Sequence, residues 1–246
     1  FEAIVGTDFA FGDEQVDNFE IGGKFQTDDG VFTLNLATYV TKIQDMQREV
    51  NQSDPVSGVA QSIFNTADAT IFGVEAETRI RVTDNLIVTG NIGVIDAEYD
   101  EILFDISGDG VINDADMNLR IPRVPEMTYV VGLVHELLVG NNEFITRLNY
   151  QYRDDFAFTN DNRGFIQSFN NLEGNITWVT PWDGISLSVY GRNLFDEVQA
   201  GGDTQIPFGG PLSNGVNAPF DPAPAAGTFS PLQRGRTIGV EAIISF

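Results

Sequence analysis

The chain has 246 residues, a formal net charge of -23 and no cysteine. The lack of cysteine excludes disulfides, thiolate metal sites and cysteine nucleophiles, and the single histidine, His135, excludes a site with several histidine ligands. Acidic residues number 36 against 13 basic ones, which argues against nucleic acid as a partner because phosphate binding needs a basic face. The sequence contains no run of about 18 apolar residues, the length that a membrane-spanning helix needs.

Apolar and polar side chains alternate along most of the chain, which is the period of a β-strand with one apolar and one polar face. Short turns rich in Gly, Asn and Asp alternate with long connections between these stretches. The pattern predicts about nine antiparallel strands, near residues 16–28, 30–44, 69–82, 86–104, 127–139, 143–155, 165–179, 185–195 and 235–246. The long connections are expected near residues 45–68, 105–125, 156–164 and 196–234.

Strand length and loop asymmetry favour a membrane barrel over a soluble β-sandwich or β-propeller. Soluble sheets usually have strands of about five or six residues, whereas a transmembrane β-strand needs about 9–11. Outer-membrane barrels have short turns at one rim and long loops at the other, and the same asymmetry is predicted at every connection here. We therefore predict an all-β fold, an antiparallel transmembrane β-barrel.

Polar side chains on the predicted strand 143–155 agree with a wide polar lumen. Arg147, Asn149, Gln151 and Arg153 fall on one face, where a soluble core would bury them without partners. Aromatic residues near strand ends would form the girdles at the two membrane interfaces. They are Phe144, Tyr150, Tyr152, Trp178 and Trp182. In the alternative interpretation, a sandwich, these aromatics would cover sheet edges.

Three groups of segments resemble the C-terminal part of TonB-dependent outer-membrane receptors. They are residues 18–24 with 29–39, residues 71–75 with 84–86 and 96–99, and residues 190–196 with 234–240 and the terminal Phe246. Their order and spacing match hairpins of that family, and the likeness covers nearly all residues from about 13 to 246.

The resemblance implies a barrel of 22 strands around an N-terminal plug. On this interpretation residues 1–246 are one partial barrel, with about nine C-terminal strands and without the plug domain. The implied function is nutrient uptake across the outer membrane of a Gram-negative bacterium, not enzyme catalysis. The implied partners are outer-membrane lipid, TonB through the missing plug region, and a small nutrient of unknown identity. In such a receptor the 196–234 connection would be an outer loop, where Phe208, Phe220 and Phe229 offer apolar contacts to a ligand or simply face solvent.

The sharpest local motif lies in the 105–125 connection. Residues 105–116 have the spacing of a twelve-residue calcium loop and resemble its dockerin-type variant, with Gly110 at the sharp turn. The predicted oxygen ligands are Asp105, Ser107, Asp109, the carbonyl of Val111, Asn113 and Asp116. We predict a structural Ca²⁺ that fixes an outer loop, and a solvated acidic turn is the alternative. This motif also supports a second functional hypothesis, a secreted or surface β-rich calcium-binding module.

Overall fold

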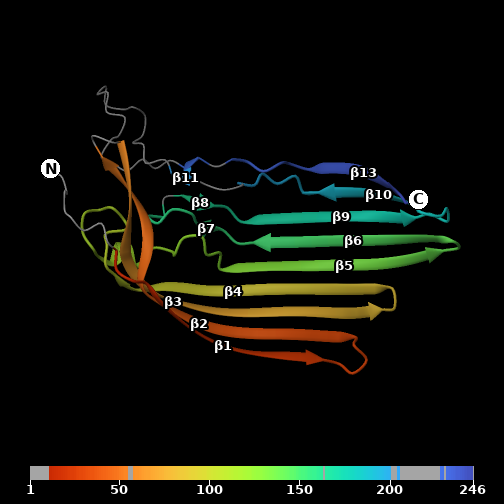
Figure 1. The fold of residues 1–246 in the computed structure, drawn as a ribbon, viewed down its shortest axis with the longest axis horizontal. Helices are drawn as coiled ribbons and strands as arrows, with labels where there is room; N and C mark the ends of the chain where they lie inside the picture. Colours follow the sequence, from red (N-terminus) through yellow and green to blue (C-terminus); the bar gives the residue numbers. More distant parts are fainter. Residues whose placement is uncertain are drawn as a thin grey trace.

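The computed structural model describes residues 11–54, 58–162, 164–200, 204–205, 228–229 and 231–245; side chains of residues 51–61, 204–205 and 228–229 lie outside that description. One antiparallel sheet of nine strands dominates, and spatial neighbours follow one another along the chain (Figure 1). The strands are β1 (Gln15–Gln26), β2 (Phe32–Asp54), β3 (Gly58–Thr83), β4 (Leu86–Ile102), β5 (Met127–Val139), β6 (Asn142–Arg153), β9 (Phe169–Val179), β10 (Ile185–Arg192) and β13 (Thr237–Ile244). The nine predicted strands and the all-β class are confirmed. Strands β1 and β13 form the two edges of the sheet, so these nine strands do not close into a barrel by themselves.

Short turns join the strands at one end of the sheet (Figure 1). Gly30 and Gly184 occupy left-handed backbone conformations there, with φ of 65° and 70°. A side chain at Gly184 would also overlap the backbone carbonyl of Ser245. Glycine is therefore the residue that these tight turns require.

The long connections lie at the opposite end and carry small elements of their own. Helix α1 (Asp114–Met117) lies between β4 and β5. A two-stranded sheet of β7 (Phe156–Ala157) and β8 (Phe165–Ile166) lies between β6 and β9. The predicted strand 165–179 is thus divided: its first residues pair with β7, and only Phe169–Val179 joins the main sheet. None of the helices in the described ranges is long and apolar enough to span a membrane.

The predicted loop at residues 45–68 is wrong, because most of it is strand. Strands β2 and β3 stay paired from Met46 opposite Ala67 to Asp54 opposite Gly58. A bulge marks the start of this extension, where Asp45 has a φ of 53° and the register shifts. Beyond it the hairpin turns away from the direction of the other strands (Figure 1). The polar sequence concealed the strands, since backbone hydrogen bonds maintain a ladder in solvent without an apolar face.

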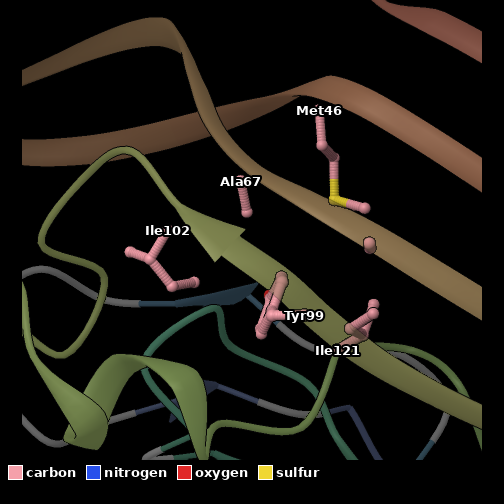
Figure 2. Close-up of a cluster of buried hydrophobic side chains, with 6 residues drawn as sticks. Met46, Ala67, Tyr99, Ile102 and Ile121 are labelled. Atoms are coloured by element: carbon pink, nitrogen blue, oxygen red, sulfur yellow. The ribbon is translucent and has the colours of Figure 1, made fainter.

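A buried apolar cluster supports the base of this hairpin. It consists of Met46, Ala67, Ala69, Tyr99, Ile102 and Ile121. Figure 2 shows side chains from β2, β3, β4 and the connection after α1 meeting there. The cluster therefore joins the hairpin to the loop that follows β4.

Part of the last long connection, β11 (Thr204–Gln205) paired with β12 (Thr228–Phe229), is described by its backbone alone. The predicted contacts of Phe208, Phe220 and the Phe229 side chain, and the terminal Phe246, lie outside the described residues.

Candidate functional site

One face of the main sheet is apolar across all nine strands. Register places one exposed apolar residue from each strand on this face. These residues are Phe19, Leu36, Phe72, Ile92, Val131, Leu148, Ile176, Val189 and Val240. Phe19 remains 72% exposed and Val240 81% exposed, so the chain itself leaves this face uncovered. A continuous apolar face of this kind matches the lipid-facing surface of a membrane barrel.

Two rows of aromatic rings border the apolar face. Near the short turns, Trp178 packs against Phe144 and Trp182, with centroid distances of 6.4 and 5.9 Å. Near the long loops, Tyr129 packs against Tyr152 and Tyr150 at 5.0 and 5.9 Å. Along β6, eight residues separate Phe144 from Tyr152, about 26 Å at roughly 3.3 Å per residue. Because barrel strands are tilted by about 35–45°, this separation covers most of an apolar band about 25 Å tall, and the aromatic residues predicted for the two girdles lie in these two rows.

The opposite face of the sheet is polar. Arg147, Asn149 and Gln151 share this face with Asn175, Glu173 and Asn171 of β9, their partners in register. On β1–β5 the same face holds a hollow of about 560 Å³ whose polar lining residues include Glu20, Lys24, Glu75 and Glu77. The predicted polar lumen face is therefore present on β1–β3, β6 and β9, whereas β5 carries Val130 and Val134 on this face.

The predicted calcium loop is folded around Asp116. This carboxylate is fully buried and accepts hydrogen bonds from the backbone N–H groups of Ile106, Ser107 and Asn113, at 2.9, 2.7 and 3.0 Å. Burial alone would raise the pKa of Asp116, but hydrogen bonds from Ser107 and Asn113 outweigh it and hold the pKa below its ordinary value. Asn113 caps α1 by accepting from the Ala115 N–H. Asp116 therefore holds both ends of the loop together.

Other predicted ligands also form hydrogen bonds within the loop. Asp105 accepts from the N–H groups of Gly108 and Gly110, both at 2.8 Å, and from the Ser107 hydroxyl at 3.2 Å. Asp109 accepts from the Val111 N–H at 3.0 Å and from the Asn113 amide at 2.8 Å. Across the part of the chain that the structure describes, no three acidic or histidine side chains gather closely enough to hold a metal. Calcium binding by this loop stays a prediction.

Docking between distant outer loops was not predicted from the sequence. The Arg120 guanidinium donates to the Asp155 carboxylate at 2.9 Å. The Asn162 side-chain amide accepts a hydrogen bond from the backbone N–H of Arg120 and donates one to the backbone carbonyl of Arg120. The amide of Asn160 then reaches the backbone carbonyl of Glu49 on β2 at 3.0 Å. We call these packed segments, residues 46–50, 103–126, 154–162 and 164–168, the outer cap. Its partners lie 35 to 111 positions apart, so no local pattern reveals them.

The architecture defines a class of protein. A meander of long antiparallel strands, apolar on one face and polar on the other, with two aromatic rows and long loops at one end, is the wall of an outer-membrane β-barrel. The model of the TonB-dependent receptor-like β-barrel family matches residues 3–194. The chain belongs to this family, whose members lie in the outer membrane of Gram-negative bacteria.

Solved structures share the fold at low sequence identity. The ferric yersiniabactin uptake receptor FyuA from Yersinia pestis superposes with a TM-score of 0.70 at 23% identity, over 96% of this chain and 30% of that one. The siderophore receptor PiuA from Acinetobacter baumannii gives 0.63 at 17% identity, over 93% of this chain and 28% of that one. The copper transporter OprC gives 0.61 at 17% identity, over 95% and 32%. The chain thus spans about a third or less of the length of these receptors. No curated protein matches the sequence.

Proposed function

We propose that the protein carrying this chain is an outer-membrane receptor that imports a small nutrient and is energised by TonB. The observation that carries the proposal is the two-faced sheet, whose one face is apolar on all nine strands and whose other face is polar on β1–β3, β6 and β9. Such a wall suits the passage of a polar solute past the membrane. The names of the structural neighbours, an uptake receptor, a siderophore receptor and a copper transporter, support a transport role.

The proposal assigns different tasks to different parts of the receptor. The strands described above seal the lumen from lipid, and the outer cap stands where a nutrient arrives from outside. The proposal assigns contact with TonB, and the plug that TonB acts on, to parts of the receptor other than this chain; structural neighbours about three times longer than this chain support that assignment.

Cell fractionation and uptake assays test the proposal. We expect the native protein in the outer-membrane fraction, soluble only with detergent. Labelled ferric chelates, copper, cobalamin and glycans are then offered to the wild-type strain, a strain lacking the receptor and a strain lacking TonB. We expect accumulation of one nutrient to fall in both mutants and to return when the whole receptor is restored. Uptake that is unchanged without TonB, or a protein soluble without detergent, would contradict the proposal.

We also propose a structural Ca²⁺ in the loop 105–116, as a separate matter from uptake. The support is the ligand spacing in the sequence and the closed loop around Asp116. A secreted calcium module has no such support, because a water-soluble protein would not leave one sheet face apolar across nine strands.

A further inference from the structure

Strands β10 and β13 are too short to cross the apolar band by themselves. Each has 8 residues, whereas β6 has 12 and β9 has 11, and a transmembrane strand needs about 9–11. Near the long loops, β9 therefore continues past the end of β10 (Figure 1). Residues 169–173 of β9 pair with β6 on one side, but on the other side they meet no strand within the described part of the chain. An open strand edge at membrane depth is costly, because lipid offers no hydrogen bonds.

The turn that follows β10, residues 193–197, covers this edge. The Leu194 N–H donates to the Leu172 carbonyl at 2.9 Å. The Glu197 carboxylate accepts the Asn170 N–H, also at 2.9 Å. The turn thus satisfies two backbone groups on the open edge of β9, groups that a longer β10 would have bonded.

The same turn holds the beginning of β13. The Asp196 carboxylate accepts the backbone N–H of Arg236, one residue before β13 begins, at 2.8 Å. The Arg236 guanidinium forms an ion pair with the Asp196 carboxylate at 3.8 Å and donates to the Leu194 carbonyl at 3.5 Å. Residues 193–197 therefore connect β9 to β13 at the level where β10 no longer lies between them.

The side chain of Asn193 fixes the shape of the turn. Its amide donates to the Glu197 carbonyl at 2.9 Å and accepts the Glu197 N–H at 3.0 Å. The Asp196 N–H also donates to the Asn193 carbonyl, at 2.9 Å. Asn193 and Asp196 have left-handed backbone conformations, with φ of 47° and 59°, which Asn and Asp adopt more readily than most residues. The residue types of the turn thus match the conformation that the covering contacts require.

The turn also continues the apolar face of the sheet. A side chain at Gly191, which lies on the same face as Val189, would overlap Leu194, so the Leu194 side chain covers this glycine. Phe195 is 52% exposed and packs edge-on against Tyr150, in the aromatic row near the long loops, at a centroid distance of 6.3 Å. The apolar face and its aromatic row therefore extend beyond the end of β10.

We propose that residues 193–197 are part of the lipid-facing wall. They replace the missing ends of β10 and β13, and Leu194 and Phe195 contact the outer leaflet where the acyl chains meet the headgroups. Continuity with the apolar face identifies lipid as the occupant, because these two side chains adjoin residues that face lipid on every strand. The inference depends neither on the nutrient nor on TonB. A plain extracellular loop, with Phe195 in water, is the alternative that the experiments distinguish.

Fluorescence quenching tests the contact with lipid. The whole receptor carrying Phe195→Trp is reconstituted in phosphatidylcholine vesicles whose acyl chains bear bromine near the headgroup or near the chain end. After subtraction of the wild-type signal, bromine near the headgroup should quench the added tryptophan about twofold or more strongly than bromine at the chain end, since aromatic girdles lie at the headgroup level. Val198→Trp is the matched control, because Val198 is also apolar and exposed but lies beyond the turn. Quenching at position 195 that is no stronger than at position 198 would overturn the proposal.

Amide exchange of the whole receptor in detergent tests the replacement of the strand end. Asn193→Gly suits a left-handed φ but removes both side-chain hydrogen bonds, so the N–H groups of Asn170 and Leu194 should exchange about tenfold faster. Asn141→Gly, in the short turn between β5 and β6, is the control and should leave both rates unchanged. Unchanged rates in Asn193→Gly would contradict the covering role of the turn. If that variant does not assemble, Glu197→Ala takes its place, and an unchanged rate at Asn170 then contradicts it.

Discussion

The phenol ring of Tyr39 lies over Gly73, its register partner on β3, so that a side chain on Gly73 would overlap the ring. Tyr190 of β10 covers Gly239 of β13 in the same way. Each pair fills the surface left bare by glycine with the ring of the neighbouring strand, and so couples two strands on the polar face.

Replacement of Gly73 by alanine should destabilise the β2–β3 pair. The new methyl group displaces Tyr39 from its position, and overpacking of this kind commonly costs about 1–3 kcal/mol. Thermal unfolding of the purified receptor in detergent measures the loss. Gly23→Ala is the matched control, because a side chain there has no atom within 4 Å. Equal stability of the two variants would show that the ring does not constrain position 73.

A charge on the apolar face should impair membrane assembly. Val240 is 81% exposed near the middle of β13, so Val240→Lys would place an ammonium group against lipid. The cost is about 2–4 kcal/mol near the bilayer midplane. The amount of folded receptor in the outer membrane is the measurement. Glu241→Lys introduces the same residue one position along, on the polar face, and should assemble at a higher level; the reverse order would contradict the assignment of the two faces.

The loop around Asp116 should be sensitive to acid. A carboxyl whose pKa is lower in the folded protein contributes stability above its ordinary pKa of about 3.9, and this contribution is lost as the pH falls toward and below that value. Asp116→Asn should loosen the loop at neutral pH, and each lost hydrogen bond to the charge is worth about 1.5–3 kcal/mol. Amide exchange of Ile106 and Ser107 between pH 3 and pH 7 reports the change. The exposed Asp114→Asn is the control and should leave these rates unchanged.

Calcium should protect the same loop if the predicted ligands bind it. At a concentration about 100-fold above its dissociation constant, an ion bound only by the folded loop adds about 2.7 kcal/mol of stability. Limited proteolysis of the receptor in calcium and in chelator gives the comparison. Asp109→Asn should abolish the difference, whereas Asp96→Asn, outside the motif, should retain it. Identical cleavage in calcium and chelator would favour the solvated acidic turn.

The strands of the barrel wall were predictable from the sequence because the environment of each strand face determines the pattern of neighbouring residues along the chain. Lipid on one side and a polar lumen on the other impose a period of two, as in β6, where Arg147 and Leu148 face opposite ways. Glycines such as Gly140, with a φ of 62°, mark the tight turns. In the membrane-spanning part of the sheet, the predicted strand ends lie within a few residues of the observed ones.

Outside the membrane the same reasoning failed. Backbone hydrogen bonds between the two strands hold the outer half of the β2–β3 hairpin in place. The Asn65 side-chain amide also donates to the backbone carbonyl of Asp45 at 2.6 Å, across the bulge. Solvent on both faces removes the alternating pattern, so residues 45–68 were predicted as a loop. Contacts such as Arg123 with Phe158 depend on how separate loops meet, which no spacing within one segment encodes.

The outer half of the β2–β3 hairpin keeps its shape through main-chain hydrogen bonds, which every residue except proline can donate. Apart from Met46, Asn65 and Ala67, whose side chains support its base, the amino acids of this outer half are therefore free to vary while the hairpin stays in place. On a bacterial surface, antibodies and phages that bind this segment would select for substitutions in it. Such substitutions would cost the fold of the receptor little stability. The outer half of the β2–β3 hairpin is equally a suitable place to insert a foreign epitope for display.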